Sequence, residues 1–157
     1  MIRYIIILAT VLTALLSGCG GGSDSVLPPG DRDLSGLEGT WTVNLSYTGT
    51  LTSQYGNEDI SDSGVGTWVI SKNAINSGFP LDWSYDGTTL SIHWQTSVQS
   101  NDPVCGTEDT TVNAQLMIAL APTGNSASIT GTGNVTKARE KCNDSTGIIT
   151  YTGTISR

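Results

Sequence analysis

Apolar and polar residues alternate with a period of two along most of the chain after residue 34. In "GTWTVNLSY" the residues Trp41, Val43, Leu45 and Tyr47 are apolar or aromatic, and the residues between them are polar. The same alternation recurs in "VGTWVIS" and in the closing segment "GIITYTGTISR". A period of two is typical of a strand with one buried face, and helix signals are nearly absent. The pattern therefore predicts an all-β protein.

One predicted hairpin is "FPLDWSYDGTTLSIHW", residues 79–94. Asp86-Gly87 matches a two-residue type I′ turn, which requires positive φ at both central positions. Pairing across that turn places Trp83 opposite Leu90 and collects the large apolar residues on one face. His93 falls on the polar face, with Asp82 two residues from the position directly opposite. A slip of one residue would turn both apolar sets outward, so the agreement supports the predicted faces.

A second predicted hairpin is "TVNAQLMIALAPTGNSASITGTGNVTK", residues 111–137, with its tip at Thr123-Gly124. This register aligns the apolar residues of the two strands on one face. Within the hairpin it pairs Val112 with Val135. Continued beyond the hairpin, the same register pairs Glu108 with Arg139 and Cys105 with Cys142. Strict alternation puts the cysteines on the face opposite the apolar set, so a bulge, or loops before the strand ends, is needed to bring them inward.

These segments amount to about seven or eight long antiparallel strands, several with interior glycines. Interior glycines mark places where a sheet bends or coils sharply. Long meandering strands remove their exposed edges by closing on themselves. The sequence therefore favours an antiparallel up-and-down β-barrel, with a two-sheet β-sandwich as the alternative.

The chain opens with Arg3 and an apolar run from Tyr4 to Leu16, 13 residues long. That length suits the apolar region of a secretory signal and falls short of the roughly 20 residues of a membrane-spanning helix. The run ends in Leu16-Ser17-Gly18-Cys19, which closely resembles the bacterial lipobox. The resemblance implies cleavage before Cys19 and acylation of that residue, which would anchor the protein by fatty-acyl chains. A cleaved signal with Cys19 unmodified, or a short uncleaved anchor, is the alternative.

The same resemblance predicts location and domain organisation. Gly20 stands where Asp would retain a lipoprotein in the inner membrane, so we expect a lipid-anchored outer-membrane protein facing the periplasm of a bacterial envelope. We divide the chain into a lipoprotein signal peptide (1–18), the lipidated cysteine with a flexible Gly/Ser/Pro/Asp-rich tether (19–33), and a single β-barrel domain (34–157).

The net charge argues against some classes of binding partner, and the cysteine content predicts a disulfide. Loss of Arg3 with the signal leaves 6 basic against 14 acidic residues, a net charge of −8. An acidic chain without a Lys/Arg cluster argues against nucleic acid and against electrostatic binding to anionic lipid. With Cys19 assigned to lipid, Cys105 and Cys142 should form a disulfide in an oxidising periplasm, worth roughly 3–4 kcal/mol in the chain-entropy account.

The segment "LEGTWTVNL" resembles the first-strand Gly-x-Trp signature of lipocalins and related barrels, through Gly39 and Trp41. The resemblance implies that Trp41 packs across the closed end of a barrel against an Arg near the last strand, where Arg157 is suitably placed. It also implies a small ligand. The alternative is that Trp41 is simply a core aromatic.

No pattern of catalytic, metal or cofactor residues emerges. His93 is the single histidine and no nucleophile elbow accompanies it, so we expect no enzymatic activity. The acidic stretch "YGNEDISDSG", residues 55–64, lacks the spacing of a calcium loop and is expected to be a solvated hairpin loop. The sequence predicts neither a metal site nor a cofactor.

The aromatic residues provide the remaining functional signal. Their side chains could line a cup for one apolar ligand or lipid, or could simply fill a small barrel. The five pocket candidates are Trp41, Trp68, Phe79, Trp83 and Trp94. We therefore expect a non-enzymatic, lipid-anchored barrel that binds a small hydrophobic ligand or lipid. The alternative is a structural or interaction lipoprotein with a packed core that binds another envelope protein.

Overall fold

The structure is a computed structural model that describes residues 33–157. The predicted signal peptide, the lipobox-like segment with Cys19, and most of the predicted tether lie outside the described residues. The described part contains eight antiparallel strands: β1 (Gly39–Ser53), β2 (Gly56–Ser71), β3 (Ala74–Asn76), β4 (Asp82–Tyr85), β5 (Thr89–Asp102), β6 (Gly106–Ala119), β7 (Ser126–Arg139) and β8 (Ser145–Ser156). The predicted all-β class is confirmed. Within these residues no helix has the length and apolarity to cross a bilayer.

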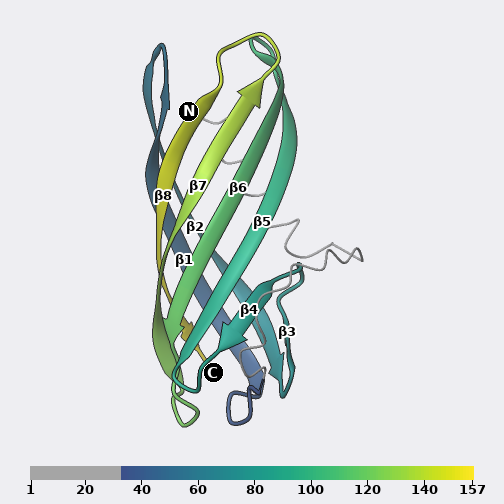
Figure 1. Cartoon of the computed structure of the whole chain (residues 1–157), viewed down its shortest axis with the longest axis vertical. Coiled ribbons are helices and arrows are strands. Elements are labelled where there is room, and N and C mark those ends of the chain that lie inside the picture. Colours follow the sequence, from purple (N-terminus) through teal and green to yellow (C-terminus); the bar gives the residue numbers. More distant parts are fainter. Residues whose placement is uncertain (1–32) are drawn as a thin grey trace.

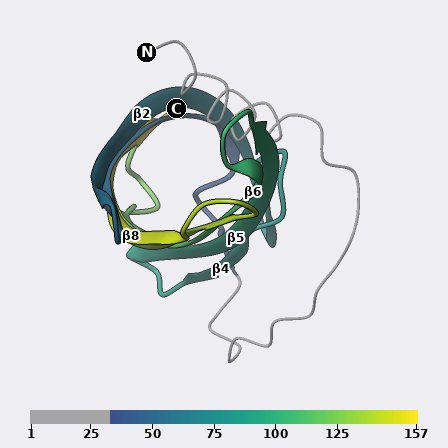
Figure 2. The same cartoon turned by 90° about the horizontal axis from the view of Figure 1, so that it is seen from above.

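The strands form one sheet in the order β3-β2-β1-β8-β7-β6-β5-β4. Almost every strand pairs with its neighbour in the chain, and β8 returns to pair with β1, which gives the predicted up-and-down connectivity (Figure 1). Seen from above, the sheet curls around a central axis (Figure 2). The circuit is open between β3 and β4, so the molecule is a strongly curled half-barrel rather than a fully closed barrel or a two-sheet sandwich.

Glycines allow the first and last long strands to approach closely. An ideal Cβ at Gly153 would lie 2.1 Å from the carbonyl oxygen of Asn44, and one at Gly147 would lie 2.1 Å from that of Thr50. Any side chain at these positions would collide with the β1 backbone. Glycine at these positions therefore permits the close approach of β8 to β1.

One end of the barrel, which we call the Trp41 end, is sealed by the segment that precedes β1. Leu34 and Leu37 are fully buried there, and so is Trp41. The Leu34 amide donates a hydrogen bond to the Lys72 carbonyl, and the Trp41 indole Nε1 donates to the Leu37 carbonyl at 2.8 Å. We call the opposite end, formed by the β1–β2, β5–β6 and β7–β8 connections, the disulfide end.

Arg157 covers the Trp41 end. Its Cζ lies 4.7 Å from the centroid of the Trp41 ring, a cation–π distance. Its Nη1 donates to the carbonyls of Gly36 and Glu38, and its Nη2 donates to that of Pro122. The contact between Trp41 and Arg157 that the lipocalin resemblance implies is present.

The predicted turn of the β4–β5 hairpin is wrong by two residues. Tyr85 pairs with Leu90, so the turn is longer than Asp86-Gly87. The Asp86 carboxylate accepts hydrogen bonds from the amides of Thr88 and Thr89, which stabilises the longer turn. Because the shift is an even number of residues, the apolar face is unchanged.

The predicted register of the β6–β7 hairpin is confirmed, including Glu108 opposite Arg139. Cys105 and Cys142 form a disulfide with their Cα atoms 5.1 Å apart. Both cysteines lie in the connections just outside β6 and β7, where strict alternation no longer applies. Strict alternation would place the cysteines on the face opposite the apolar set. The structure avoids this by placing both cysteines in loops rather than by a bulge.

The expectation of a solvated loop over residues 55–64 is also wrong. Only Gln54 and Tyr55 form the turn, and β2 begins at Gly56. Asp59 lies opposite Thr50 of β1, whose hydroxyl donates to the Asp59 carboxylate at 2.7 Å, whereas Glu58 and Asp62 lie opposite Leu51 and Tyr47.

We predict that Arg157→Ala lowers the free energy of unfolding by about 1–2 kcal/mol, because it removes the cation over Trp41 and several hydrogen bonds at an exposed site. Urea denaturation followed by tryptophan fluorescence would measure this. Arg157→Lys keeps the charge but loses the planar fork, so its loss should be smaller. An unchanged unfolding midpoint in Arg157→Ala would contradict the role assigned to this residue.

Candidate functional site

The inward-facing hydrophobic residues include both buried and half-buried side chains. Toward the Trp41 end most are buried, as at Leu90, Leu116 and Ile118. From the middle of the barrel toward the disulfide end, some pack against the same core but stay partly exposed, beside buried residues such as Leu51 and Val135. We call this partly exposed set the inner patch, and it consists of Tyr47, Ile60, Trp94 and Val112.

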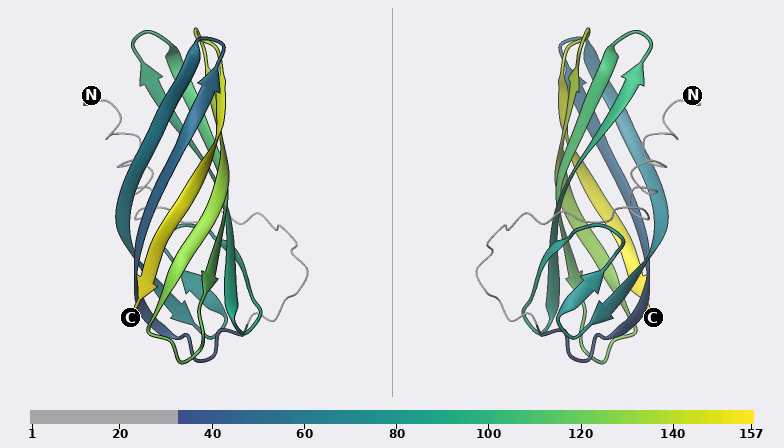
Figure 3. Two further views of the ribbon diagram at one scale, coloured as in Figure 1. Left: turned by 90° about the vertical axis from the view of Figure 1, so that its left-hand side faces the viewer. Right: turned by 90° about the vertical axis from the view of Figure 1, so that its right-hand side faces the viewer.

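The strand lengths explain this difference. β2 pairs with the short β3 only over Val69–Ser71, and β5 pairs with the short β4 only over residues 90–93. Among the described strands, β2 from residue 56 to 68 and β5 from residue 94 to 102 pair on one edge only. Figures 1 and 3 show β3 and β4 confined to the lower part while β2 and β5 continue to the upper end. The sheet is thus open where the inner patch lies.

An aromatic cluster lies at the base of the inner patch. The ring centroids of Trp94 and Tyr151 are 5.3 Å apart in a T-shaped contact, and those of Phe79 and Trp94 are 6.3 Å apart. Tyr47 and Tyr151 are tilted relative to one another at 5.9 Å. The two contacts of Trp94 have favourable edge-to-face geometry. Trp94 therefore joins the packed core to the half-buried surface.

The structure divides the five predicted pocket aromatics into two groups. Trp41, Trp68 and Trp83 are buried in the core, at 0%, 5% and 8% exposure. Phe79 and Trp94 are half-buried and in mutual contact. Sequence reasoning missed Tyr47 and Tyr151 as site residues, although both belong to the alternating apolar sets that predicted their strands.

A cluster of charged side chains occupies the same inner face toward the disulfide end. Glu108 Oε1 accepts from Arg139 Nε at 2.9 Å, and Glu108 Oε2 lies 3.3 Å from Lys137 Nζ. Arg139 Nη2 reaches Glu58 Oε2 at 3.5 Å. The side chains of Glu108 and Lys137 are only 7% and 8% exposed. We call these four residues the ionic cluster.

The ionic cluster could have been found in the sequence. Glu108 has the same parity as Val112 along β6, and Arg139 has the same parity as Val135 along β7, so alternation turns both charges inward. Charged side chains are rarely buried unless they are paired. Alternation does not reveal that Glu58 joins the cluster, because Glu58 lies on a strand distant in sequence.

Ser145 adjoins the cluster. It lies directly opposite Lys137 in the β7–β8 ladder and is 3% exposed. Its Oγ has no hydrogen-bond partner, the one buried side-chain polar atom of residues 33–157 in that state. Buried hydroxyls normally have partners, so this group calls for an explanation.

Burial also affects the tyrosines of the barrel. It raises the pKa of Tyr47, Tyr85 and Tyr151 above the ordinary value of 10.0. For Tyr47 the nearby Asp62 charge raises the pKa further. The neutral phenol is thus the favoured form in the folded protein.

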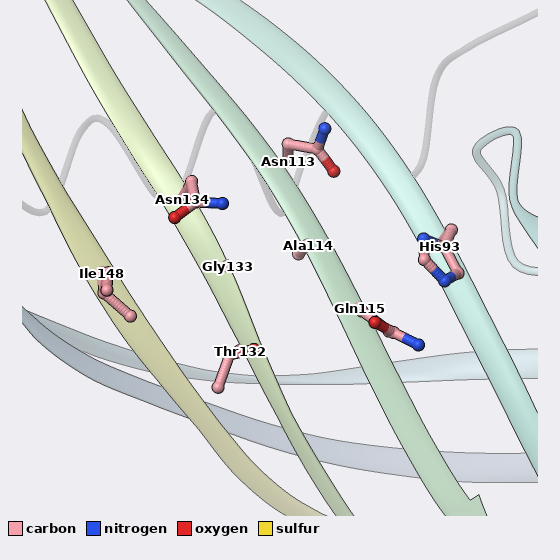
Figure 4. A pocket seen from close by; sticks show the side chains of 8 residues that line it. All are labelled: His93, Asn113, Ala114, Gln115, Thr132, Gly133, Asn134 and Ile148. Atoms are coloured by element: carbon pink, nitrogen blue, oxygen red, sulfur yellow. The ribbon is translucent and has the colours of Figure 1, made fainter.

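The outer face of the sheet carries a polar depression of about 320 Å³ (Figure 4). His93 lines it from β5, beside Asn113 and Gln115 of β6. His93 is half-buried and lies directly opposite Asp82, not two residues away as predicted, because of the register shift. The described residues contain no group of three His, Cys, Asp or Glu side chains that could hold a metal ion.

Comparison with protein-family models, with curated proteins and with solved structures finds no match to this chain. The inner face combines a half-buried patch with an aromatic base, is bordered by the ionic cluster, and lies in a sheet whose β2 and β5 edges are unpaired there.

We predict that stability falls as pH rises through about 10, because the buried tyrosines release their protons more readily in the unfolded chain. Below that pH their contribution is fully present. Tyr151→Phe keeps the ring and removes one ionisable group, so the decline should be shallower in this variant. Urea midpoints between about pH 8 and pH 11 would measure it; identical slopes for the two proteins would contradict the assignment.

Proposed function

We propose that this chain is a lipid-anchored, non-enzymatic binding protein of the bacterial envelope that takes a small hydrophobic ligand or lipid on its half-buried inner face. The observation that carries the proposal is the half-burial of Tyr47, Ile60, Trp94 and Val112 beside a fully packed core. Side chains of this kind gain about 25 cal/mol for each Å² of apolar surface that a ligand removes from water.

The arrangement of polar groups supports the same function. Ligand sites are mostly apolar, with a few placed polar groups that orient the ligand. Here the aromatic cluster supplies the apolar surface, and the ionic cluster supplies the polar groups on the same face. The unpaired edges of β2 and β5 leave one side of the sheet open for entry.

The lipobox supports the proposed location. Acylation of Cys19 would tether the domain next to a membrane, with a polar linker of about a dozen residues between them. A lipid-binding domain held at the periplasmic face of the outer membrane would have its ligand at high local concentration.

A second candidate function is the binding of another envelope protein by strand addition. The observation in its favour is the unpaired edge of β5 from Trp94 to Asn101, which contains neither a charged residue nor Pro. Proteins usually protect exposed edges with such residues, and an unprotected edge can accept a partner strand. β2 is less suitable because Glu58, Asp59 and Asp62 lie along its edge.

The anchor is tested by Cys19→Ser. We expect this variant to leave the membrane fraction, because the sulfur that would carry the lipid is lost and the proposed anchor is lost with it. Cell fractionation and immunoblotting would measure the distribution, with Cys105→Ser as the control for loss of a cysteine unrelated to lipidation. Unchanged membrane association of Cys19→Ser would refute the lipid anchor.

Ligand binding is tested by native mass spectrometry of the secreted Cys19→Ser protein after gentle purification. We expect a reproducible extra mass that is released on denaturation and identified as a lipid or small apolar molecule. Trp94→Ala should reduce its occupancy several-fold, whereas Gln95→Ala, the outward-facing neighbour on β5, should not. A clean apo mass for the unsubstituted site would count against the proposal and favour the protein-binding alternative.

A further inference from the structure

The ionic cluster and Ser145 include two buried side chains whose hydrogen-bond donors are not all used. Lys137 carries three N–H groups and has one partner, Glu108, while Arg139 carries five. The Arg139 donors are directed to Glu108, Glu58 and the Asn143 carbonyl. The Ser145 hydroxyl has no partner. Lys137 and Ser145, which face each other across β7 and β8, therefore form a buried pair of donors without a complete set of acceptors.

The charges of the cluster already balance. Glu58 and Glu108 supply two negative charges, and Lys137 and Arg139 supply two positive charges. A buried anion added to this cluster would be uncompensated, which is strongly unfavourable at low dielectric. Unused donors without an excess of positive charge thus favour a neutral acceptor, such as the carbonyl oxygen of an ester or amide.

The distance between this donor pair and the aromatic cluster sets the length of the ligand that could contact both. Trp94 lies in the same cross-strand row as Gly133, and Lys137 is four residues farther along β7. At about 3.3 Å per residue the two levels are roughly 13 Å apart along the strand. Val112 and Val135 lie between them on the same inner face. An apolar body of that length would therefore run from the aromatic cluster to the donor pair.

We propose that Lys137 and Ser145 bind the neutral carbonyl oxygen of an uncharged amphiphile, such as an acyl ester or amide, whose apolar body lies against Trp94 and Tyr151. This inference rests on the proposed ligand-binding function and specifies the ligand class. It also accounts for the Ser145 hydroxyl, which would gain an acceptor when the ligand is bound.

The test compares three probes of equal chain length on the mature chain carrying Cys19→Ser. The probes are monolaurin, which has a neutral ester, laurate, which has a charged carboxylate, and dodecane, which has no head group. Quenching or enhancement of tryptophan fluorescence below the critical micelle concentration would report binding. We expect monolaurin to bind about tenfold more tightly than laurate or dodecane.

Variants assign the effect to the donor pair. Ser145→Ala should weaken monolaurin binding about three- to tenfold and leave dodecane binding unchanged, because one hydrogen bond is lost. Ser128→Ala, an exposed serine on β7, is the matched control and should bind like the parent. Lys137→Met is the second variant and should remove most of the preference for the ester; circular dichroism would check that each variant is folded.

The outcomes separate the two proposals. If laurate binds as tightly as monolaurin, or if Ser145→Ala and Lys137→Met leave the ester preference intact, the carbonyl site is refuted while ligand binding on the inner face stands. If none of the three probes binds the parent protein, the proposed function fails, and the carbonyl site fails with it.

Discussion

The pairing of β1 with β8 is the constraint on which the rest of the structure depends. It runs over eleven residue pairs, from Thr42 with Ser156 to Thr52 with Thr146. Without it the chain would be an open meander, with its two terminal long strands as exposed edges. The pairing curls the sheet so that alternate residues of every strand meet inside, and it brings Arg157 over Trp41. Gly147 and Gly153 permit the close approach, since a Cβ at either position would strike the β1 backbone.

The unequal lengths of the strands divide the barrel into a stabilising part and an open part. β3 and β4 are only three and four residues long, and they complete the sheet edges near the Trp41 end alone. There most inward side chains are buried, and the segment before β1 seals the end. Beyond them β2 and β5 continue without partners on one edge, and the inner patch remains half-buried. The same topology thus supplies both the core that holds the fold and the surface to which we assign ligand binding.

The disulfide and the ionic cluster support each other at the far end of the barrel. The disulfide holds the β7–β8 connection, where Asp144 accepts a hydrogen bond from the Arg139 amide and Asn143 presents its carbonyl to the guanidinium. Arg139 is thereby oriented toward Glu108 and Glu58 on the inner face. Removal of one partner from a buried cluster of this kind leaves an uncompensated charge, so the position of the loop matters for the charges inside.

The sequence by itself determined which residues face inward, because alternation with a period of two is a local property of each strand. It also determined the β6–β7 register and the pairing of Cys105 with Cys142, since one short connection fixes both. The predicted β4–β5 turn is misplaced because the turn length is set by the hydrogen bonds of the Asp86 carboxylate to the Thr88 and Thr89 amides, not by the preference of Asp86-Gly87 for a two-residue turn. The prediction of a loop over residues 55–64 is wrong because acidic residues are atypical of strands, whereas the two-residue turn at Gln54-Tyr55 pairs this whole segment with β1.

Only the tertiary structure decided where the barrel is open and what meets inside it. Glu58 and Arg139 are 81 residues apart in the sequence. Trp94 on β5 and Tyr151 on β8 are separated in the sheet by β6 and β7, so the curl of the sheet, rather than any local pattern, brings them together. Alternation places each of these side chains on the inner face but leaves their partners unspecified. The partners follow from the closure of β8 onto β1 and from the shortness of β3 and β4, which are non-local properties of the folded chain.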